Sequence, residues 1–305
     1  MTPLFSVVLP VYNRANLLGD ALRSVLAQTE QDFEIVVVDD GSTDNPSRVV
    51  EAIGDPRIEF VRHENRGGGA ARNTGIDKAR GRFVAFLDSD DRFLPHHLAT
   101  MRRLLESAPG AAGYARILVD RGEGRVILKP PRAIREDEDM AIYLLCDRGF
   151  VPTSTIVVER SLAQTIRFHG NLAAAEDTDF AIRATLAGHR FVMAEEPGVV
   201  WKDNDDPNRL SSGRRGATMR PWIEGLRPQI PSKAYYGCLG WAYAKYVAVN
   251  DRFAAFRLYM AALLRGCYRP SLAGIIFLQI FLSDRAYRTL ADTAILRLRA
   301  GLRPR

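Results

Sequence analysis

Cysteine is scarce in this chain, which excludes small disulfide-stabilised folds. Only Cys146, Cys238 and Cys267 occur among the 305 residues. Because their number is odd and their spacing fits no metal site, they predict neither a disulfide framework nor a cysteine-ligated metal. Buried thiols of a cytosolic protein are the simplest interpretation. With 47% hydrophobic and 26% charged residues, the composition is that of an ordinary globular protein.

Long apolar runs are missing as well. The longest run covers residues 272–282 and includes Gln279, whereas a helix needs roughly 20 apolar residues to cross a bilayer. The first residues carry no basic leader, and the short apolar run that follows contains Pro10, so we expect a strand there and no signal peptide. A cytoplasmic protein is therefore expected.

Several motifs of known chemistry are absent. The chain has no GxxxxGK[ST] loop, no GxSxG and no HExxH, which argues against a P-loop nucleotidase, an α/β-hydrolase and a zinc protease. Gly67 and Gly69 begin a GxG pattern, but Arg72 stands where a dinucleotide-binding loop carries its third glycine. A nicotinamide cofactor is not expected.

Acidic residues are scarce near the carboxyl terminus. Residues 206–305 contain 17 lysine and arginine residues and five acidic residues, whereas residues 1–205 contain 25 and 31. A basic region of this kind suits nucleic acid, an anionic membrane surface or an acidic substrate. Its apolar segments with scattered arginines fit lipid or protein contacts better, so no nucleic-acid partner is expected.

The first hundred residues alternate between strand and helix signals. Strand patterns cover residues 5–12, 33–40, 58–61 and 83–87, and helical patterns separate them. This order predicts an α/β fold with a mostly parallel sheet and helices on both faces.

Two of these strands end in acids, Asp39 and Asp40 after one and Asp88, Asp90 and Asp91 after the other. The carboxyl ends of parallel strands share one sheet edge, where open α/β sheets bind ligands. Carboxylate oxygens suit Mg²⁺ or Mn²⁺, which favours a metal-bridged diphosphate. A solvated turn explains the second group equally well, and helix capping explains residues 42–44.

The rest of the chain carries weaker patterns. Residues 111–130 predict strands, 136–146 a helix with an acidic first turn, and 190–202 a closing pair of strands. Glu176 and Asp177 open a further helix, where acids also complement the helix dipole. Beyond residue 217 two or three helices are predicted, either as an interfacial membrane segment or as a helical subdomain or dimer contact.

Four segments in order carry a family resemblance: residues 5–14, 36–44 and 67–91, and the acidic pair at 176–177. Together they resemble family 2 glycosyltransferases of the GT-A fold, closely over residues 5–91 and more loosely to about residue 211. The chain is similar in particular to bacterial enzymes that build exopolysaccharide repeat units on a lipid carrier.

The resemblance implies inverting transfer of a sugar from a nucleoside-diphosphate donor, with UDP expected, to a glycan or lipid-linked acceptor. Mn²⁺ or Mg²⁺ is the implied cofactor. Asp90 would bind this metal, Asp177 would be the general base, and Glu176 would be its neighbour towards the acceptor. The implied donor-binding residues are Pro10, Val11 and Tyr12 at the base, Asp39 at the base edge, Arg72 at the nucleotide, Asp88 at the ribose, and also Arg14, Asp40 and Ser89. Asp91 is expected to cap a helix.

One departure concerns the loop after the last strand. Many relatives carry a histidine there, but residues 201–211 contain none, and Arg209 is expected to clamp the phosphates instead. The expected organisation is a GT-A domain at 1–211, with a nucleotide-sugar half at 1–100 and an acceptor half at 101–211. A basic helical region at 217–305 would contact an anionic membrane or a second subunit. The alternative is a nucleotide-sugar-binding pseudoenzyme or assembly protein, against which the retained acids argue.

Overall fold

The computed structural model describes residues 2–122, 125–170, 172, 174–202, 215–283, 286, 287, 289 and 290. These residues form two compact units. The sheet unit contains the described residues up to 144 and those from 148 to 202, and the helical unit contains 145–147 and the described residues from 215 onwards. Within these ranges every helix is too short or too polar to cross a bilayer.

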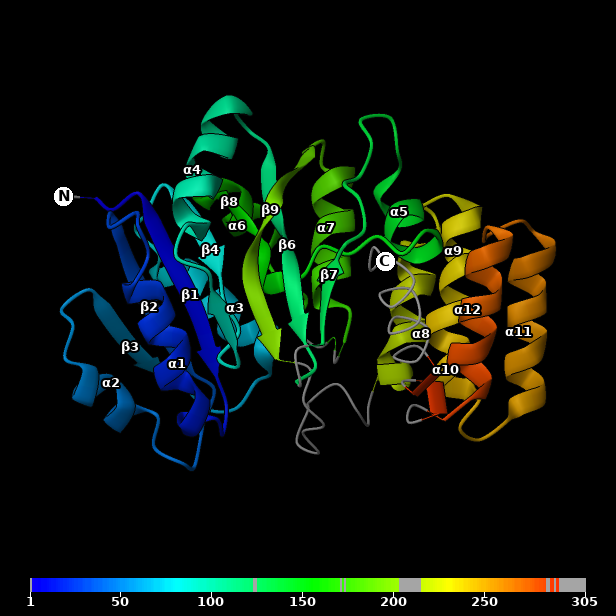
Figure 1. Ribbon diagram of the computed structural model, residues 1–305, viewed down its shortest axis with the longest axis horizontal. Helices are drawn as coiled ribbons and strands as arrows, with labels where there is room; N and C mark the ends of the chain where they lie inside the picture. Colours follow the sequence, from blue (N-terminus) through cyan, green and yellow to red (C-terminus); the bar gives the residue numbers. More distant parts are fainter. Residues whose placement is uncertain are drawn as a thin grey trace, which may run out of the picture. The chain divides into compact units, whose positions relative to one another are not determined.

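A nine-stranded sheet is the centre of the sheet unit (Figure 1). Its strands are β1 (Phe5–Val11), β2 (Phe33–Asp39), β3 (Ile58–Arg62), β4 (Phe83–Phe86), β5 (Asp91–Phe93), β6 (Ala112–Asp120), β7 (Val126–Lys129), β8 (Val157–Glu159) and β9 (Phe191–Lys202). They lie in the order β3, β2, β1, β4, β8, β6, β9, β5, and β7 pairs with β6. The first four in this order are parallel, and β8 then pairs antiparallel with both β4 and β6.

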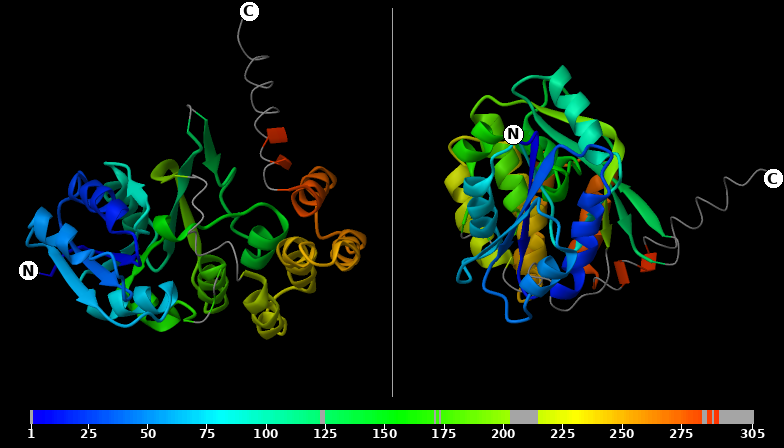
Figure 2. Two further views of the ribbon diagram at one scale, coloured as in Figure 1. Left: turned by 90° about the horizontal axis from the view of Figure 1, so that it is seen from below. Right: turned by 90° about the vertical axis from the view of Figure 1, so that its left-hand side faces the viewer.

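Helices cover both faces of this sheet. The helices α1 (Ala15–Leu26), α2 (Ser47–Ile53), α3 (Gly68–Lys78), α4 (His97–Ser107) and α6 (Arg160–Ile166) contact its strands. The chain also forms α5 (Met140–Cys146), α7 (Glu176–Leu186) and a 3₁₀ turn at Thr153–Thr155. Figure 2 shows α1 and α3 on opposite sides of the strands, and both helices contact β1. The predicted α/β fold with a mostly parallel sheet and helices on both faces is confirmed.

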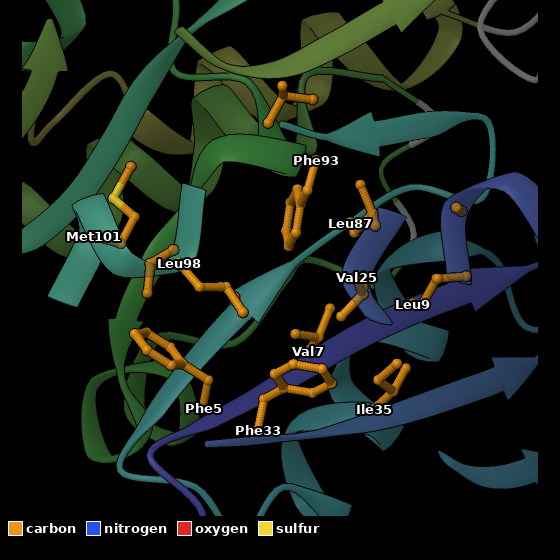
Figure 3. Packing of buried hydrophobic residues seen from close by; sticks show 14 of the residues in the cluster. Phe5, Val7, Leu9, Val25, Phe33, Ile35, Leu87, Phe93, Leu98 and Met101 are labelled. Atoms are coloured by element: carbon orange, nitrogen blue, oxygen red, sulfur yellow. The ribbon is translucent and has the colours of Figure 1, made fainter. Parts of the chain in front are cut away.

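Alternate side chains of β1 enter different cores because successive residues of a strand point to opposite faces. On one face, Val7 and Leu9 belong to a buried cluster that includes Val25 of α1 and Met101 of α4 (Figure 3). Fully burying side chains of this size contributes about 1.5–3 kcal/mol each. This packing anchors the strand whose carboxyl end leads into the site.

The opposite face of the sheet packs closely against α3. Val36 and Val38 of β2 contact Ala71 of this helix. A Cβ atom on Gly75 would lie 2.3 Å from Cγ1 of Val8, so only glycine fits there. The small residues of α3 therefore let the helix approach the strands, which places its first turn at their carboxyl ends.

Two local predictions are wrong, and one strand was not predicted. Residues 191–202 form one strand, because pairing with β6 continues through a register shift at Arg116 and does not turn back at Pro197. Residues 91–93 form β5, which is too short to show an alternating pattern. The acids at 136–139 precede α5 and do not form its first turn; Asp139 Oδ1 accepts from the N–H of Ile142 at 2.9 Å, as a helix cap does.

The helical unit is helical as predicted, but its described residues form five α-helices where two or three were expected. They are α8 (Arg215–Leu226), α9 (Ser232–Cys238), α10 (Ala244–Val247), α11 (Arg252–Leu264) and α12 (Pro270–Phe281), with a π-helical turn at Leu239–Tyr243. All three cysteines of the chain are buried thiols in this unit. Burial raises the pKa of the Cys238 thiol to about 12, which keeps it protonated and unreactive.

Candidate active site

The loops that follow β1 and β2 hold each other in place. Asn13 donates its backbone N–H to Oγ of Ser42 (2.9 Å) and accepts the N–H of Thr43 on Oδ1 (2.8 Å). Oδ2 of Asp44 accepts the N–H of Ala15 at the start of α1 (2.8 Å), which satisfies a helix-end donor. The capping interpretation therefore holds for Asp44, although the helix that it caps is α1.

Asp39 is a fully buried acid at the end of β2. Its Oδ1 accepts the N–H of Ser42 at 2.8 Å. Its Oδ2 accepts no hydrogen bond from the described residues and lies 3.5 Å from Nε of Arg62. A buried acceptor without a hydrogen bond is costly, and such atoms usually have a ligand or water partner. Asp39 is therefore a candidate for ligand binding.

Asp40 uses both carboxylate oxygens on the backbone. Oδ1 accepts the N–H of Arg66 (2.8 Å) and Oδ2 accepts that of Gly67 (2.9 Å). Nδ1 of His63 lies 3.3 Å from Oδ1. These contacts hold the segment that leads into α3. A donor contact for Asp40 stays a prediction.

The glycines before and within the first turn of α3 allow a close backbone approach. Gly67 has a φ of 91°, a conformation that residues with a side chain rarely adopt. A Cβ atom on Gly69 would lie 2.5 Å from the carbonyl oxygen of His169. Packing against the 168–170 segment thus explains the glycine-rich stretch without a dinucleotide.

We expect Gly69→Ala to destabilise the protein by about 1–3 kcal/mol, the usual cost of overpacking. Gly170→Ala is the matched control, because a Cβ atom there meets nothing within 4 Å; its effect should stay within about 0.5 kcal/mol. Urea unfolding of both variants measures the difference. Equal midpoints would contradict the close approach.

Arg72 of α3 joins two acids that are far apart in the sequence. Its Nη2 donates to Oδ1 of Asp88 (2.5 Å) and its Nη1 donates to Oε2 of Glu176 (2.8 Å). Burial disfavours the charged guanidinium, but the two carboxylates outweigh this effect and raise the pKa of Arg72 above its usual value. Arg72 therefore stays charged and ties the end of β4 to the first turn of α7.

Phe168 is a site residue that no pattern in the sequence indicates. The Arg72 guanidinium carbon lies 5.2 Å from the centre of its ring, within cation–π range. The ring stacks on Phe180 at 4.8 Å. Asn73 holds the Phe168 backbone from both sides, donating to its carbonyl at 2.9 Å and accepting its N–H at 2.8 Å. Phe168 therefore covers one side of Arg72.

The acids after β4 have different surroundings. Asp90 accepts a hydrogen bond from Nη1 of Arg14, in the loop after β1, whereas Asp88 faces Arg72. The side chains of Asp88 and Asp90 remain 31% and 27% exposed. Both carboxylates are thus close to solvent and each has a cationic partner.

Asp91 is instead a structural residue. It is buried in β5, and its Oδ2 accepts the hydroxyl of Ser154. Oγ of Ser154 also accepts the N–H of Asp88 at 3.2 Å. The expectation that Asp91 caps a helix is wrong, because α4 begins only after His96. Ser154, which sequence reasoning missed, connects the 3₁₀ turn to the end of β4.

The acidic residues suit a divalent metal that shares its ligands with a substrate. No group of three or more His, Cys, Asp or Glu side chains that could hold a metal ion occurs among the described residues. Mg²⁺ commonly binds proteins through one or two carboxylates and takes its remaining oxygens from phosphates and water. Asp88 and Asp90 supply hard oxygen donors of this kind, so the residues fit a metal that arrives with a diphosphate.

Asp177 lies in the first turn of α7, directly after Glu176. Burial raises its pKa to about 6; the N–H of Thr178, which donates to Oδ1 at 2.7 Å, lowers the pKa, and the neighbouring Glu176 raises it. Ala175, just before α7, has a φ of 65°. Such backbone strain costs about 1–3 kcal/mol and is concentrated at functional sites.

Asp179, one residue beyond Thr178, has a structural environment. It is buried, and its Oδ2 pairs with Nη2 of Arg183 at 2.6 Å. Arg183 in turn donates to the carbonyl oxygens of Ile166 and Arg167. The acids in the first turn of α7 therefore have different partners: Asp179 pairs with Arg183 of the same helix, whereas Glu176 pairs with Arg72 of α3.

The remaining predicted residues belong to the same loops, with one exception. Pro10 and Val11 end β1, and Tyr12 follows them. Ser89 is buried between two partly exposed acids, Asp88 and Asp90. Arg209 lies outside the described residues, so its predicted clamp cannot be placed.

Two solved structures resemble this architecture. S. aureus TarS in complex with UDP-GlcNAc matches with a TM-score of 0.65 and 20% identity over 99% of this chain and 93% of that one. Mannosyltransferase PcManGT from Pyrobaculum calidifontis, in complex with GDP-Man and Mn²⁺, matches with a TM-score of 0.59 and 19% identity over 98% and 81%. At these identities the likeness shows the fold. The predicted GT-A fold, a glycosyltransferase architecture, is confirmed.

The sequence comparisons show to which glycosyltransferase family the chain belongs. The family model described as glycosyl transferase family 2 matches residues 6–166. Amylovoran biosynthesis glycosyltransferase AmsB of Erwinia amylovora is 30% identical over 246 residues, which cover 76% of this chain and 80% of that protein. The chain therefore belongs to glycosyl transferase family 2, as the resemblance of its motifs predicted.

Proposed function

We propose that this enzyme transfers a sugar from a UDP-sugar to an acceptor hydroxyl with inversion, in the presence of Mn²⁺ or Mg²⁺. The observation that carries the proposal is the network in which Arg72 joins Asp88 to Glu176, next to the high-pKa carboxyl of Asp177. The donors in the TarS and PcManGT structures, UDP-GlcNAc and GDP-Man, support a nucleotide-sugar substrate. The name of AmsB supports a role in surface polysaccharide or exopolysaccharide biosynthesis.

The donor's nucleoside is proposed to bind at the ends of β1, β2 and β4. Oδ2 of Asp39, which accepts no hydrogen bond from the described residues, would take an N–H of the base. Val11 pairs with Asp39 in register, so the backbone around it would line the base together with Pro10 and Tyr12. Asp88, oriented by Arg72, would accept from the ribose.

The metal is proposed to bind at Asp90. A bound divalent cation would stabilise the negative charge that develops on the departing nucleoside diphosphate. Asp90 supplies a hard, partly exposed carboxylate oxygen for it, and Arg14 places a second positive charge at the same position. Ser89, buried beside Asp90, is proposed to contact the donor.

Asp177 is proposed to act as the base. As the acceptor oxygen forms its bond to the anomeric carbon, its proton passes to the carboxylate of Asp177. The bond from the anomeric carbon to the diphosphate oxygen breaks, and the nucleoside diphosphate leaves with that electron pair. Attack from the face opposite the leaving group inverts the anomeric centre. A carboxyl with a pKa near 6 is well matched to this role at neutral pH.

The acceptor is proposed to be a growing glycan on a lipid carrier, which places the enzyme in the cytoplasm at the inner face of the membrane. Glu176 would contact the acceptor while Arg72 holds it, and Arg209 would clamp the phosphates. The basic carboxyl-terminal residues support a location beside anionic lipid.

A thermal-shift panel of nucleotide sugars with and without Mn²⁺ tests the donor site. A UDP-sugar at about 100 times its dissociation constant should stabilise the wild type by about 2.7 kcal/mol. Asp39→Asn should weaken donor binding about tenfold or more, because a hydrogen bond to a charged group contributes about 1.5–3 kcal/mol. Exposed Glu136→Gln is the control and should behave as the wild type. A panel without any stabilising nucleotide sugar, or an unaffected Asp39→Asn variant, would refute the assignment.

A further inference from the structure

Helix α11 is apolar on two opposite sides. Its inner side consists of Ala255, Tyr259 and Ala262, which are buried and recur at helical spacing. This side packs tightly, since a Cβ atom on Gly240 would lie 2.3 Å from Cβ of Ala262. The hydroxyl of Tyr259 donates to the carbonyl of Ala273 in α12 at 3.0 Å. The inner side therefore accounts for the attachment of α11 to the helical unit.

The outer side of α11 carries larger apolar residues. Phe253 and Leu264 are 71% and 80% exposed, and Phe256 is 41% exposed. Residues 253, 256, 260 and 264 follow the spacing of one helix stripe. A helix that is apolar all round is normally buried on all sides, whereas single exposed apolar residues are unremarkable. A contiguous stripe over the length of α11 indicates an interaction surface.

The stripe continues onto α12, which lies beside α11 (Figure 1). The rings of Phe256 and Phe281 are 6.3 Å apart, and those of Phe277 and Phe281 are 4.8 Å apart. Phe277 is itself exposed. We call the set formed by Phe253, Phe256, Met260, Leu264 and Phe277 the α11 face.

The charges around the α11 face are almost all positive. Residues 251–282 contain four arginines and a single acid, Asp251, and one of the arginines, Arg269, pairs with Asp147 at 3.1 Å. The carboxylate of Asp251 is engaged as a helix cap, accepting the N–H of Ala254 at 2.8 Å. Arg257 is exposed within the stripe. A second copy of this face would bring like charges together, whereas anionic lipid complements both the arginines and the aromatic residues.

We propose that the α11 face binds the surface of an anionic phospholipid membrane, with α11 lying in the interface and its aromatic and leucine side chains entering the acyl boundary. The 13 residues of α11 extend about 20 Å, which suits a helix parallel to the bilayer plane. This inference deepens the proposed function and rests on it, because a lipid-linked acceptor is confined to a membrane.

Co-sedimentation of the full chain with phosphatidylcholine vesicles, with or without phosphatidylglycerol, tests the proposal. The wild type should bind the mixed vesicles more tightly than pure phosphatidylcholine. Phe253→Ser combined with Leu264→Ser should weaken binding about a hundredfold or more, since each side chain contributes strongly when buried. Arg257→Gln should weaken binding to the anionic vesicles about fivefold.

Leu186→Ser is the matched control, because it removes an exposed leucine from α7 in the sheet unit and should leave vesicle binding unchanged. Wild-type binding that fails, or that survives the double substitution, would overturn the proposal. So would a wild-type dimer that the double substitution converts to a monomer, since a second copy would then occupy the face. Donor thermal shifts on the same variants separate the outcomes: vesicle binding that fails beside an intact donor shift contradicts only this inference.

Discussion

Asp177→Asn is expected to slow sugar transfer by a factor of about 10²–10⁴ while donor binding stays unchanged. The amide keeps the size of the side chain and still accepts from the N–H of Thr178, but it cannot take the acceptor's proton. Initial rates with saturating donor measure the loss, and the thermal shift with a UDP-sugar measures binding. Unchanged turnover would refute the role of Asp177.

The same substitution should also change the pH profile. Wild-type kcat/KM is expected to rise with pH through about 6, because burial raises the pKa of Asp177 to about that value and only the deprotonated form accepts a proton. In Asp177→Asn this acidic limb should disappear from the residual activity. If the rise of the rate with pH persists in Asp177→Asn, a group other than Asp177 is responsible for it.

Asp179→Asn is the control within the same helical turn. Asp179 is buried and paired with Arg183, so its loss should lower the melting temperature. The folded fraction should keep its rate and its pH profile, because Asp179 has no place in the proposed proton transfer. The two variants thus separate a stability defect from a chemical one.

Asp90→Ala is expected to abolish metal-dependent transfer and to leave the fold intact. Stabilisation of the leaving diphosphate by a metal contributes several kcal/mol, so transfer should fall at least about a thousandfold. The fold should persist because the Asp90 side chain is partly exposed and lies in a loop outside the hydrophobic core. Rates across a Mn²⁺ titration and circular dichroism measure the two effects.

Asp91→Asn is the matched control for that experiment. Asp91 is buried against Ser154, so the variant should lose stability but retain its response to Mn²⁺. Full activity of purified Asp90→Ala would eliminate Asp90 as the metal ligand. A lost Mn²⁺ response in Asp91→Asn would place the ligand one residue further along.

The strand ends were predictable because each is encoded by contiguous residues. Buried runs that finish in acids predicted strand ends at Asp39 and before Asp88, and β2 ends at Asp39 while β4 ends at Phe86. Parallel pairing of β1 with both β2 and β4 then brings these ends to one edge. Short or irregular elements were not predictable: β5 has only three residues, and β9 continues through a register shift that resembles a turn in sequence.

The partners of the acids were decided by the folded chain. Arg72 and Glu176 are 104 positions apart, and Arg14 and Asp90 are 76 apart, so no local pattern relates them. Phe168 and Ser154 are likewise far along the chain from the residues that they contact, Arg72 and Asp88. A position at a strand end does not by itself reveal the contacts of a residue. Asp40 follows Asp39 directly, yet its two carboxylate oxygens accept from the backbone N–H groups before α3.

Composition, strand and helix periodicity and the order of the acidic motifs were sufficient to predict the α/β fold and the family of this protein, because each depends on residues that are neighbours in the chain. The environment of each functional group can be described only from the tertiary structure. The pKa of Asp177, the open oxygen of Asp39 and the exposure of the apolar α11 face depend on burial and on charges supplied by distant segments. Packing brings those segments together, and sequence spacing alone does not reveal which of them meet.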